Sequence, residues 1–192
     1  MKNIILLIVL GCFVFSLQAQ EQTTGYRTIK VNGKTYTFKQ QAKPQYPYEV
    51  DLKTVSGETI NSSKLFAQNG KPTVLLFWMT TCVPCQYELA AIHKKYDSWT
   101  KEADFNFYAI SMEMPKYAHQ FAPHVKKKAW QFEAYFDFER QFRYIMPDGL
   151  NGLPQTFLLD KDGEIVYHKR KYRMGDEDIL FDEIRILIAK SQ

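Results

Sequence analysis

The chain has 192 residues, of which 45% are hydrophobic and 15% aromatic, and its 25 basic and 21 acidic side chains give a formal charge of +4. This composition excludes an intrinsically disordered chain and supplies the core of one domain of ordinary size. The charge excess is small and spread along the chain, and the two dense basic runs, 126–128 and 168–171, are typical of solvated surface, so no nucleic-acid partner is expected.

The first 19 residues predict export from the cytoplasm. Lys2 precedes an uncharged apolar run that ends at small and polar residues, as in a secretory signal peptide cleaved near Ala19. We therefore expect a signal peptide over residues 1–19 and a periplasmic or cell-envelope protein. An uncleaved membrane anchor is the alternative, although the run is slightly short for a spanning helix. Cys12 resembles a lipidation site, but the apolar run continues beyond it, so we expect it to be lost with the signal.

Residues 20–45 predict a β-hairpin extension and a linker. Two runs rich in Tyr, Thr, Ile and Val flank Asn32-Gly33 between residues 26 and 39, which is the strongest short hairpin signal. The segment 40–47 contains two prolines and reads as a linker. The main domain is accordingly placed at 46–192.

The first half of the main domain leads from short β segments to a long helix. A strand around 48–57 turns at Ser56-Gly57, and Ser62 or Ser63 is expected to cap a short helix before Gly70. The continuous apolar run 73–78 predicts a strand buried on both faces. A helix follows from about Cys82 to Trp99, with Leu89, Ile92, His93 and Tyr96 at helical spacing.

The second half continues the alternation. We expect a strand at 105–112, a partly helical segment at 115–132 that Pro123 kinks or restarts, a strand at 133–137 and a helix at 138–146. The turn-rich segment 147–154 precedes a hairpin at 155–169, and a closing amphipathic helix begins at Asp176. This order indicates an α/β sandwich with a mixed sheet.

Cys82 and Cys85 are the only cysteines beyond the predicted signal peptide. A bridge between them would close too small a loop to stabilise the fold much. A zinc site needs about four ligands, and the one histidine pair with suitable spacing, His119 and His124, is too far along the chain and is interrupted by Pro123. No metal site is therefore expected.

A redox function fits the same cysteines better. Cys82 is expected at a helix N-terminus, where unpaired N–H groups and the helix dipole favour the thiolate. Cys85 lies three positions on, near the same face and more covered, and Pro84 suits the first helical turn. We predict a dithiol–disulfide pair in which Cys82 attacks and Cys85 resolves, with no bound cofactor.

The stretches "FWMTTCVPC" and "GLPQTFLLDKDGEIVYHKR" resemble the thioredoxin-like family, in particular the TlpA and ResA group of envelope proteins. The similarity runs from about Tyr46 to Ala189. It implies a thioredoxin-like α/β fold, with a central mixed β-sheet flanked by helices, an N-terminal β-hairpin extension and a central helix–strand insertion at 112–132. It also implies a thiol–disulfide oxidoreductase.

The resemblance assigns roles to residues around the cysteines. Pro154 would be the cis-proline that faces the pair, and Trp78, Pro84 and Leu153 would contact the substrate with it. Glu113 falls near the place where ResA-like proteins carry an acidic residue, which implies a proton relay; an ordinary exposed loop glutamate is the alternative.

Three positions depart from the family pattern. Thr81 stands where many relatives have a second tryptophan, so the substrate-facing surface is expected to be less aromatic. Leu76 replaces the buried aspartate that thioredoxin uses as a proton relay. Gln155 follows Pro154 where threonine is common.

The resemblance favours a reducing role, with electrons supplied by a membrane electron-donor protein and passed to partner protein disulfides, apocytochrome c cysteines among them. The direction of electron flow stays open, because the reduction potential depends on how far the thiolate is stabilised. A peroxiredoxin-type thiol peroxidase would need P-x-x-x-T-x-x-C, but Leu75 and Met79 occupy the two required positions. A non-enzymatic thioredoxin-fold binding module remains the alternative, since a fold does not prove a function.

Overall fold

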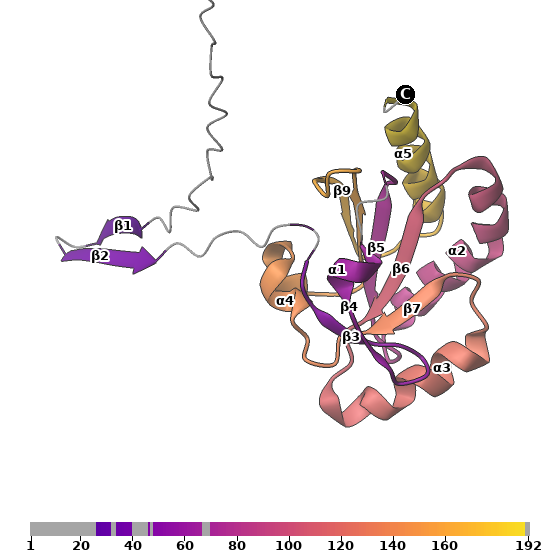
Figure 1. The fold of residues 1–192 in the computed structure, drawn as a ribbon, viewed down its shortest axis with the longest axis horizontal. Coiled ribbons are helices and arrows are strands. Elements are labelled where there is room, and N and C mark those ends of the chain that lie inside the picture. Colours follow the sequence, from indigo (N-terminus) through magenta and orange to yellow (C-terminus); the bar gives the residue numbers. More distant parts are fainter. Residues whose placement is uncertain (1–25, 32–33, 40–45, 47, 67–69, 191–192) are drawn as a thin grey trace, which may run out of the picture. The chain divides into compact units, whose positions relative to one another are not determined.

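The computed structural model describes residues 26–31, 34–39, 46, 48–66 and 70–190 (Figure 1). The chain divides into two compact units, 1–43 and 44–192. In the first unit, strands β1 (Tyr26–Val31) and β2 (Lys34–Lys39) pair antiparallel with Val31 opposite Lys34, as the predicted hairpin requires. The Asn32-Gly33 turn and the predicted signal peptide lie outside the described residues.

Among the described residues of the second unit, seven strands form one mixed sheet. The strand order is β4-β3-β7-β6-β5-β8-β9, in which β5, β6 and β7 run parallel and the other neighbours pair antiparallel. The strands are β3 (Asp51–Lys53), β4 (Thr59–Asn61), β5 (Thr73–Trp78), β6 (Asn106–Ser111), β7 (Glu133–Phe136), β8 (Gln155–Leu159) and β9 (Ile165–Arg170).

Helices cover both faces of this sheet. The helical segments are α1 (Ser62–Leu65), α2 (Val83–Glu102), η1 (Pro115–Gln120), α3 (Phe121–Lys128), α4 (Phe142–Ile145), η2 (Pro147–Leu150) and α5 (Asp176–Lys190), with η denoting 3₁₀ turns. Strand β5 is buried along its whole length, and its alternate residues point to opposite faces. Leu76 and Trp78 join a cluster with α2, α3 and α5, whereas Leu75 and Phe77 join one with α4 and segment 48–52. The predicted thioredoxin-like architecture is confirmed.

The insertion differs slightly from its predicted position. The segment 112–132 contains η1 and α3, and its strand, β7, follows at Glu133–Phe136. Pro123 lies in the first turn of α3, where its missing N–H removes no helical bond. The change from 3₁₀ turn to α-helix occurs earlier, between Gln120 and Phe121, and both residues keep right-handed helical backbone angles.

Two local predictions are corrected by side-chain contacts. The cap of α1 is Asn61, whose side chain accepts a hydrogen bond from the Ser63 N–H at 3.0 Å. Ser62 is instead buried, with its hydroxyl bonded to the backbone of Tyr48 and Val50. The helix expected at 138–146 shortens to α4, because two backbone N–H groups at its start donate to the buried Asp137 carboxylate. Within the described residues, no helix is both long and apolar enough to cross a membrane.

Candidate active site

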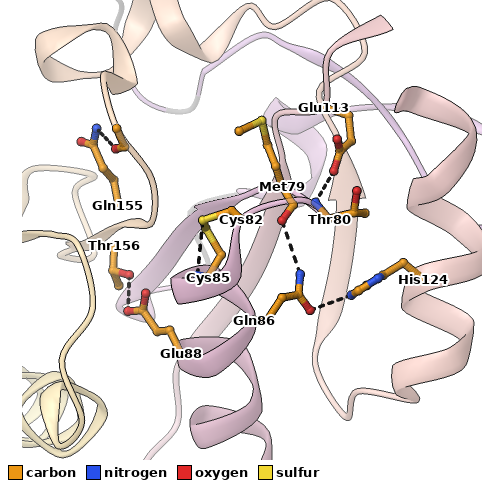
Figure 2. Close-up of a disulfide and its surroundings, with 11 residues drawn as sticks. Met79, Thr80, Cys82, Cys85, Gln86, Glu88, Glu113, His124, Gln155 and Thr156 are labelled. Carbon is orange, nitrogen blue, oxygen red and sulfur yellow. Dashed lines mark hydrogen bonds between the residues drawn. A yellow bond between two sulfur atoms is a disulfide. The ribbon is translucent and has the colours of Figure 1, made fainter. Parts of the chain in front are cut away.

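The two cysteines occupy the junction of β5 and α2. Strand β5 ends at Trp78, a short loop follows, and Cys82 is the N-cap of α2. Cys82 and Cys85 form a disulfide, and the Cys85 N–H donates to Cys82 Sγ at 3.3 Å (Figure 2). Cys82 is partly exposed, whereas Cys85 is fully buried. Because of this difference in exposure, a partner sulfur approaching from solvent meets Cys82 first. Pro84, in the first turn of α2, is exposed.

Glu88 is a site residue that the sequence analysis missed. It lies three positions after Cys85 on α2, therefore on the same helix face, and only 3% of its surface is exposed. Its Oε1 accepts a hydrogen bond from Thr156 Oγ1 at 2.8 Å, and its Oε2 has no hydrogen-bond partner among the described residues (Figure 2). Burial raises the pKa of Glu88 to about 7. The sequence signal for Glu88 was its helical spacing from Cys85, Leu89 and Ile92, which places a carboxyl on the apolar face of α2.

Charged side chains near the start of α5 adjust this environment. The Thr156 hydrogen bond and Lys169 lower the pKa of Glu88, while Asp176 and Glu177 raise it, and burial outweighs them all. The acidic pair is itself compensated: Lys169 forms an ion pair with Asp176, and Lys95 Nζ lies 3.0 Å from Glu177 Oε1. Glu88 is thus a buried carboxyl that can hold or release a proton near neutral pH.

Glu113 supports the loop before the cysteines. It follows β6 and is fully buried, so the alternative of an exposed loop glutamate is wrong. Its Oε1 accepts a hydrogen bond from the Thr80 N–H, and its Oε2 has no partner in the described part of the chain (Figure 2). Thr80 Oγ1 also donates to Gln120 Oε1 at 3.0 Å. Glu113 therefore contacts the chain two residues before Cys82.

A second tether joins the loop to the inserted segment. Gln86 Nε2 donates to the Met79 carbonyl at 3.4 Å, and Gln86 Oε1 lies 2.8 Å from His124 Nε2 (Figure 2). Because the Gln86 amide nitrogen is the donor to Met79, its oxygen must accept, and His124 Nε2 carries the proton. Burial and the neighbouring lysines of α3 lower the pKa of His124. The loop is thus held from α2 and from α3.

Trp78 does not lie where the predicted substrate contact would place it. Its side chain is fully buried and packs edge-on against Trp130, with ring centroids 5.1 Å apart, and against the His124 ring at 5.5 Å. A partner approaching Cys82 cannot reach this ring without displacing the core. The position supports a packing role for Trp78.

The Pro154 loop meets the cysteine loop at one end of the sheet. Strands β5 and β8 are antiparallel, with Phe77 opposite Gln155, so the end of β5 lies beside the start of β8. The Leu153–Pro154 peptide is cis, as the resemblance implies, with Pro154 buried and Leu153 partly buried. The structure thus brings Leu153 and Pro154 to the end of the sheet that carries Cys82.

Gln155 and Leu76 show how two departures from the family pattern are accommodated. The Gln155 amide donates to the carbonyls of Asn151 and Gly152, at 3.2 and 2.9 Å, and its Oε1 pairs with His168 Nε2 at 3.0 Å. It therefore orders the loop that ends in Pro154. Leu76 is fully buried opposite Thr156 in the sheet, so the carboxyl at this level of the site comes from α2. Within the described residues, no group of three or more His, Cys, Asp or Glu could hold a metal ion.

Comparisons with known proteins agree on the fold and the type of site. A family model described as "AhpC/TSA family" matches residues 43–168. A "Thiol-disulfide oxidoreductase ResA" from Geobacillus thermodenitrificans is 31% identical over 104 residues, which cover 53% of this chain and 56% of that protein. The chain therefore spans about half the length of this curated relative.

Two solved structures extend the similarity. A thioredoxin-like protein from Porphyromonas gingivalis is 30% identical with a TM-score of 0.63, over 75% of this chain and 92% of that one. StoA from Bacillus subtilis is 24% identical with a TM-score of 0.54, over 72% of this chain and 98% of that one. At its lower identity, StoA supports the fold alone.

Proposed function

The chain belongs to the AhpC/TSA family of thioredoxin-like proteins, and from this premise we propose that it is a thiol–disulfide oxidoreductase that exchanges two electrons with protein disulfides or dithiols. The main support for this proposal is the different exposure of the two cysteines. Cys82 is accessible at the N-cap of α2, whereas Cys85, three positions on, is buried and forms a disulfide with Cys82. The name of the ResA relative supports this activity.

In the reducing direction, the Cys82 thiolate attacks one sulfur of a partner disulfide. The partner's S–S bond breaks, one partner thiolate leaves, and a mixed disulfide with Cys82 forms. The Cys85 thiolate then attacks Cys82 Sγ, which restores the Cys82–Cys85 disulfide and releases the second partner thiolate. Two electrons pass to the partner, and two protons end on its thiols. The N-terminus of α2 stabilises the attacking Cys82 thiolate.

Glu88 would take the proton of the buried Cys85 thiol before the second step. It lies on the same helix face as Cys85, and its pKa of about 7 lets it accept a proton near neutral pH and release it afterwards. Glu113, to which the sequence analysis gave this relay, is proposed to position the loop through Thr80 and to influence the Cys82 thiolate by its charge.

We place the protein in the periplasm or cell envelope on the strength of the signal peptide predicted at 1–19. There it would act as a reductant supplied by a membrane electron-donor protein, with apocytochrome c cysteines among its substrates. Measuring the reduction potential tests the direction: a value of about −270 mV fits a reductant, and one of about −120 mV fits an oxidant.

Trapping of the mixed disulfide tests the activity itself. The Cys85→Ser variant should accumulate protein-linked adducts that a reducing agent dissolves, because no thiol remains to resolve them. Cys82→Ser should form few adducts and be inactive. Adducts formed mainly through Cys85 would reverse the roles of the two sulfurs. Absence of adducts and of disulfide reductase activity in every form would favour the non-enzymatic binding module.

A further inference from the structure

Strand β9 holds the loop before Pro154 through a chain of side-chain hydrogen bonds. His168 Nε2, on β9, lies 3.0 Å from Gln155 Oε1. The Gln155 amide nitrogen in turn donates to the carbonyls of Asn151 and Gly152, at 3.2 and 2.9 Å. Because this amide nitrogen is a donor, the amide oxygen must accept, and His168 Nε2 carries the proton. The hydrogen bonds therefore run from β9, through Gln155, to the loop.

The two side chains of this chain of bonds differ in burial. Gln155 is fully buried, so the loss of a partner would leave a buried polar group unsatisfied. His168 is exposed, and its ring stacks on the Phe157 ring, with centroids 4.1 Å apart and planes 8° apart. A substitution at His168 can therefore remove the hydrogen bond to Gln155 without opening the core.

The backbone conformation of the loop depends on such support. Asp148, Leu150 and Gly152 have φ angles of 55°, 54° and 78°, in the left-handed region that residues other than glycine adopt only rarely. Arg170, also on β9, adds a second contact, because its Nη2 donates to the Asn151 carbonyl. Side chains of β9 thus hold the loop in an otherwise unfavourable conformation.

The same loop carries backbone groups that a partner segment can reach. The loop and the cysteine turn lie at the same end of the sheet, because Phe77 of β5 pairs with Gln155 of β8. None of the hydrogen bonds among the described residues involves the backbone of Leu153. Its amide and carbonyl can therefore pair with an extended polypeptide, as in strand addition. A movement of the loop would change the position of these groups relative to Cys82.

We propose that Gln155 and His168 are positioning residues for protein substrates. Their hydrogen bond holds residues 151–154 in the conformation in which the Leu153 backbone pairs with an extended partner segment bonded to Cys82. Both side chains act through the loop and not on the sulfurs. The inference rests on the proposed function and adds to it the residues that favour a polypeptide substrate over a small disulfide.

Release of thionitrobenzoate from two mixed disulfides tests the proposal. In one, thionitrobenzoate is bonded to the central cysteine of a short peptide; in the other, it is bonded to mercaptoethanol, which has no peptide groups. The reduced protein converts each into a free thiol and the coloured thionitrobenzoate anion while its own pair becomes a disulfide. The ratio of the two rate constants is divided by the same ratio for free glutathione, which corrects for intrinsic reactivity. For the wild type this corrected ratio should be roughly ten, because only the peptide can form backbone hydrogen bonds with Leu153.

Two substitutions at His168 separate the hydrogen bond from the ring. His168→Phe keeps a ring on Phe157 but has no ring N–H, and it should lower the rate constant for the peptide about fivefold. His168→Gln loses the ring but brings an amide N–H near the position of Nε2, and it should restore most of that rate. Both variants should react with the mercaptoethanol derivative as the wild type does, and the pH midpoint of Cys82 alkylation should be unchanged. A general loss of structure would not produce this pattern.

A substitution at Gln155 tests whether His168 acts through it. Methionine is similar in length to glutamine but lacks the amide, so Gln155→Met should slow the peptide reaction as much as His168→Phe does. The double variant should be no slower, because both substitutions break the same chain of bonds. Urea unfolding of each oxidised variant checks that the domain is folded. The two His168 variants decide the proposal even if Gln155→Met does not fold.

The outcomes separate this inference from the function on which it rests. The positioning role is wrong if the wild type shows no preference for the peptide, if His168→Phe keeps the full preference, or if His168→Gln loses as much as His168→Phe. An equal loss on both mixed disulfides, or a further loss in the double variant, would also overturn it, and in each of these cases the oxidoreductase stands. If the reduced wild type releases thionitrobenzoate from neither mixed disulfide, the proposed function itself fails.

Discussion

Replacing Glu88 with glutamine tests the buried carboxyl most directly. Glutamine matches the protonated side chain in size, and its Oε1 can still accept from Thr156 Oγ1. In the wild-type protein, burial raises the pKa of Glu88 from 4.5 to about 7. The unfolded chain therefore loses this proton near pH 4.5, whereas the folded protein keeps it until near pH 7.

The sign and size of the effect follow from this difference. Below pH 4.5 the Glu88 carboxyl is protonated in both the folded and the unfolded state, so its ionisation does not change the free energy of unfolding. As the pH rises toward 7 the unfolded state gains its charge first, so the wild-type free energy of unfolding falls, and above 7 the loss is complete at about 3 kcal/mol. The glutamine variant lacks this loss. It should equal the wild type near pH 4.5 and exceed it by up to about 3 kcal/mol at pH 8.

Urea unfolding of the oxidised protein between pH 4.5 and 8 measures the difference. Glu58→Gln, at an exposed turn, removes a surface carboxylate and controls for the change in net charge. Parallel pH profiles for the wild type and Glu88→Gln would mean that Glu88 ionises as a surface carboxyl does, and its role as proton acceptor for Cys85 would lose its basis.

Two further substitutions probe the turn near Tyr46 and the loop carboxylate. Gly163→Ala should lower the free energy of unfolding by about 2–4 kcal/mol, because Gly163 has a φ of +85° and a Cβ there would lie 2.1 Å from the Tyr46 ring. Gly57→Ala, with a φ of +93° and open space, should cost only about 1–2 kcal/mol, so equal losses would discount the contact with Tyr46. Glu113→Gln should move the midpoint of Cys82 alkylation in the reduced protein to lower pH by roughly one unit or less, since a nearby carboxylate disfavours the thiolate. An unchanged alkylation profile would limit Glu113 to supporting the loop.

The elements that local sequence determines were predictable. The apolar run 73–78 is long enough for a strand and has no polar face, so its burial on both sides follows from the pattern alone. The position of Cys82 before a proline-containing first turn predicted a helix start, and α2 begins at Val83. The hairpin strands β1 and β2 likewise follow from β-rich runs around a turn dipeptide.

What local patterns could not predict depends on contacts between distant residues. The position of Glu88 on the apolar face of α2 was visible in the sequence, but its hydrogen bond to Thr156, 68 positions away, was not. The Trp78 side chain is buried against Trp130 and His124 of the inserted segment. The family resemblance, which implied a contact with the substrate, did not predict this packing. Asn61 caps α1, because the Ser62 hydroxyl forms its hydrogen bonds with the backbone of Tyr48 and Val50.

The short spacing of the cysteine bridge has a consequence for how the protein is made. The disulfide joins residues only three positions apart, within the first turn of one helix, and ties no distant parts of the chain together. The two core clusters and the strand pairing are complete without it. The chain can therefore fold with free thiols, and the bridge can form afterwards within the folded domain. Each cycle of use then begins and ends with the same architecture.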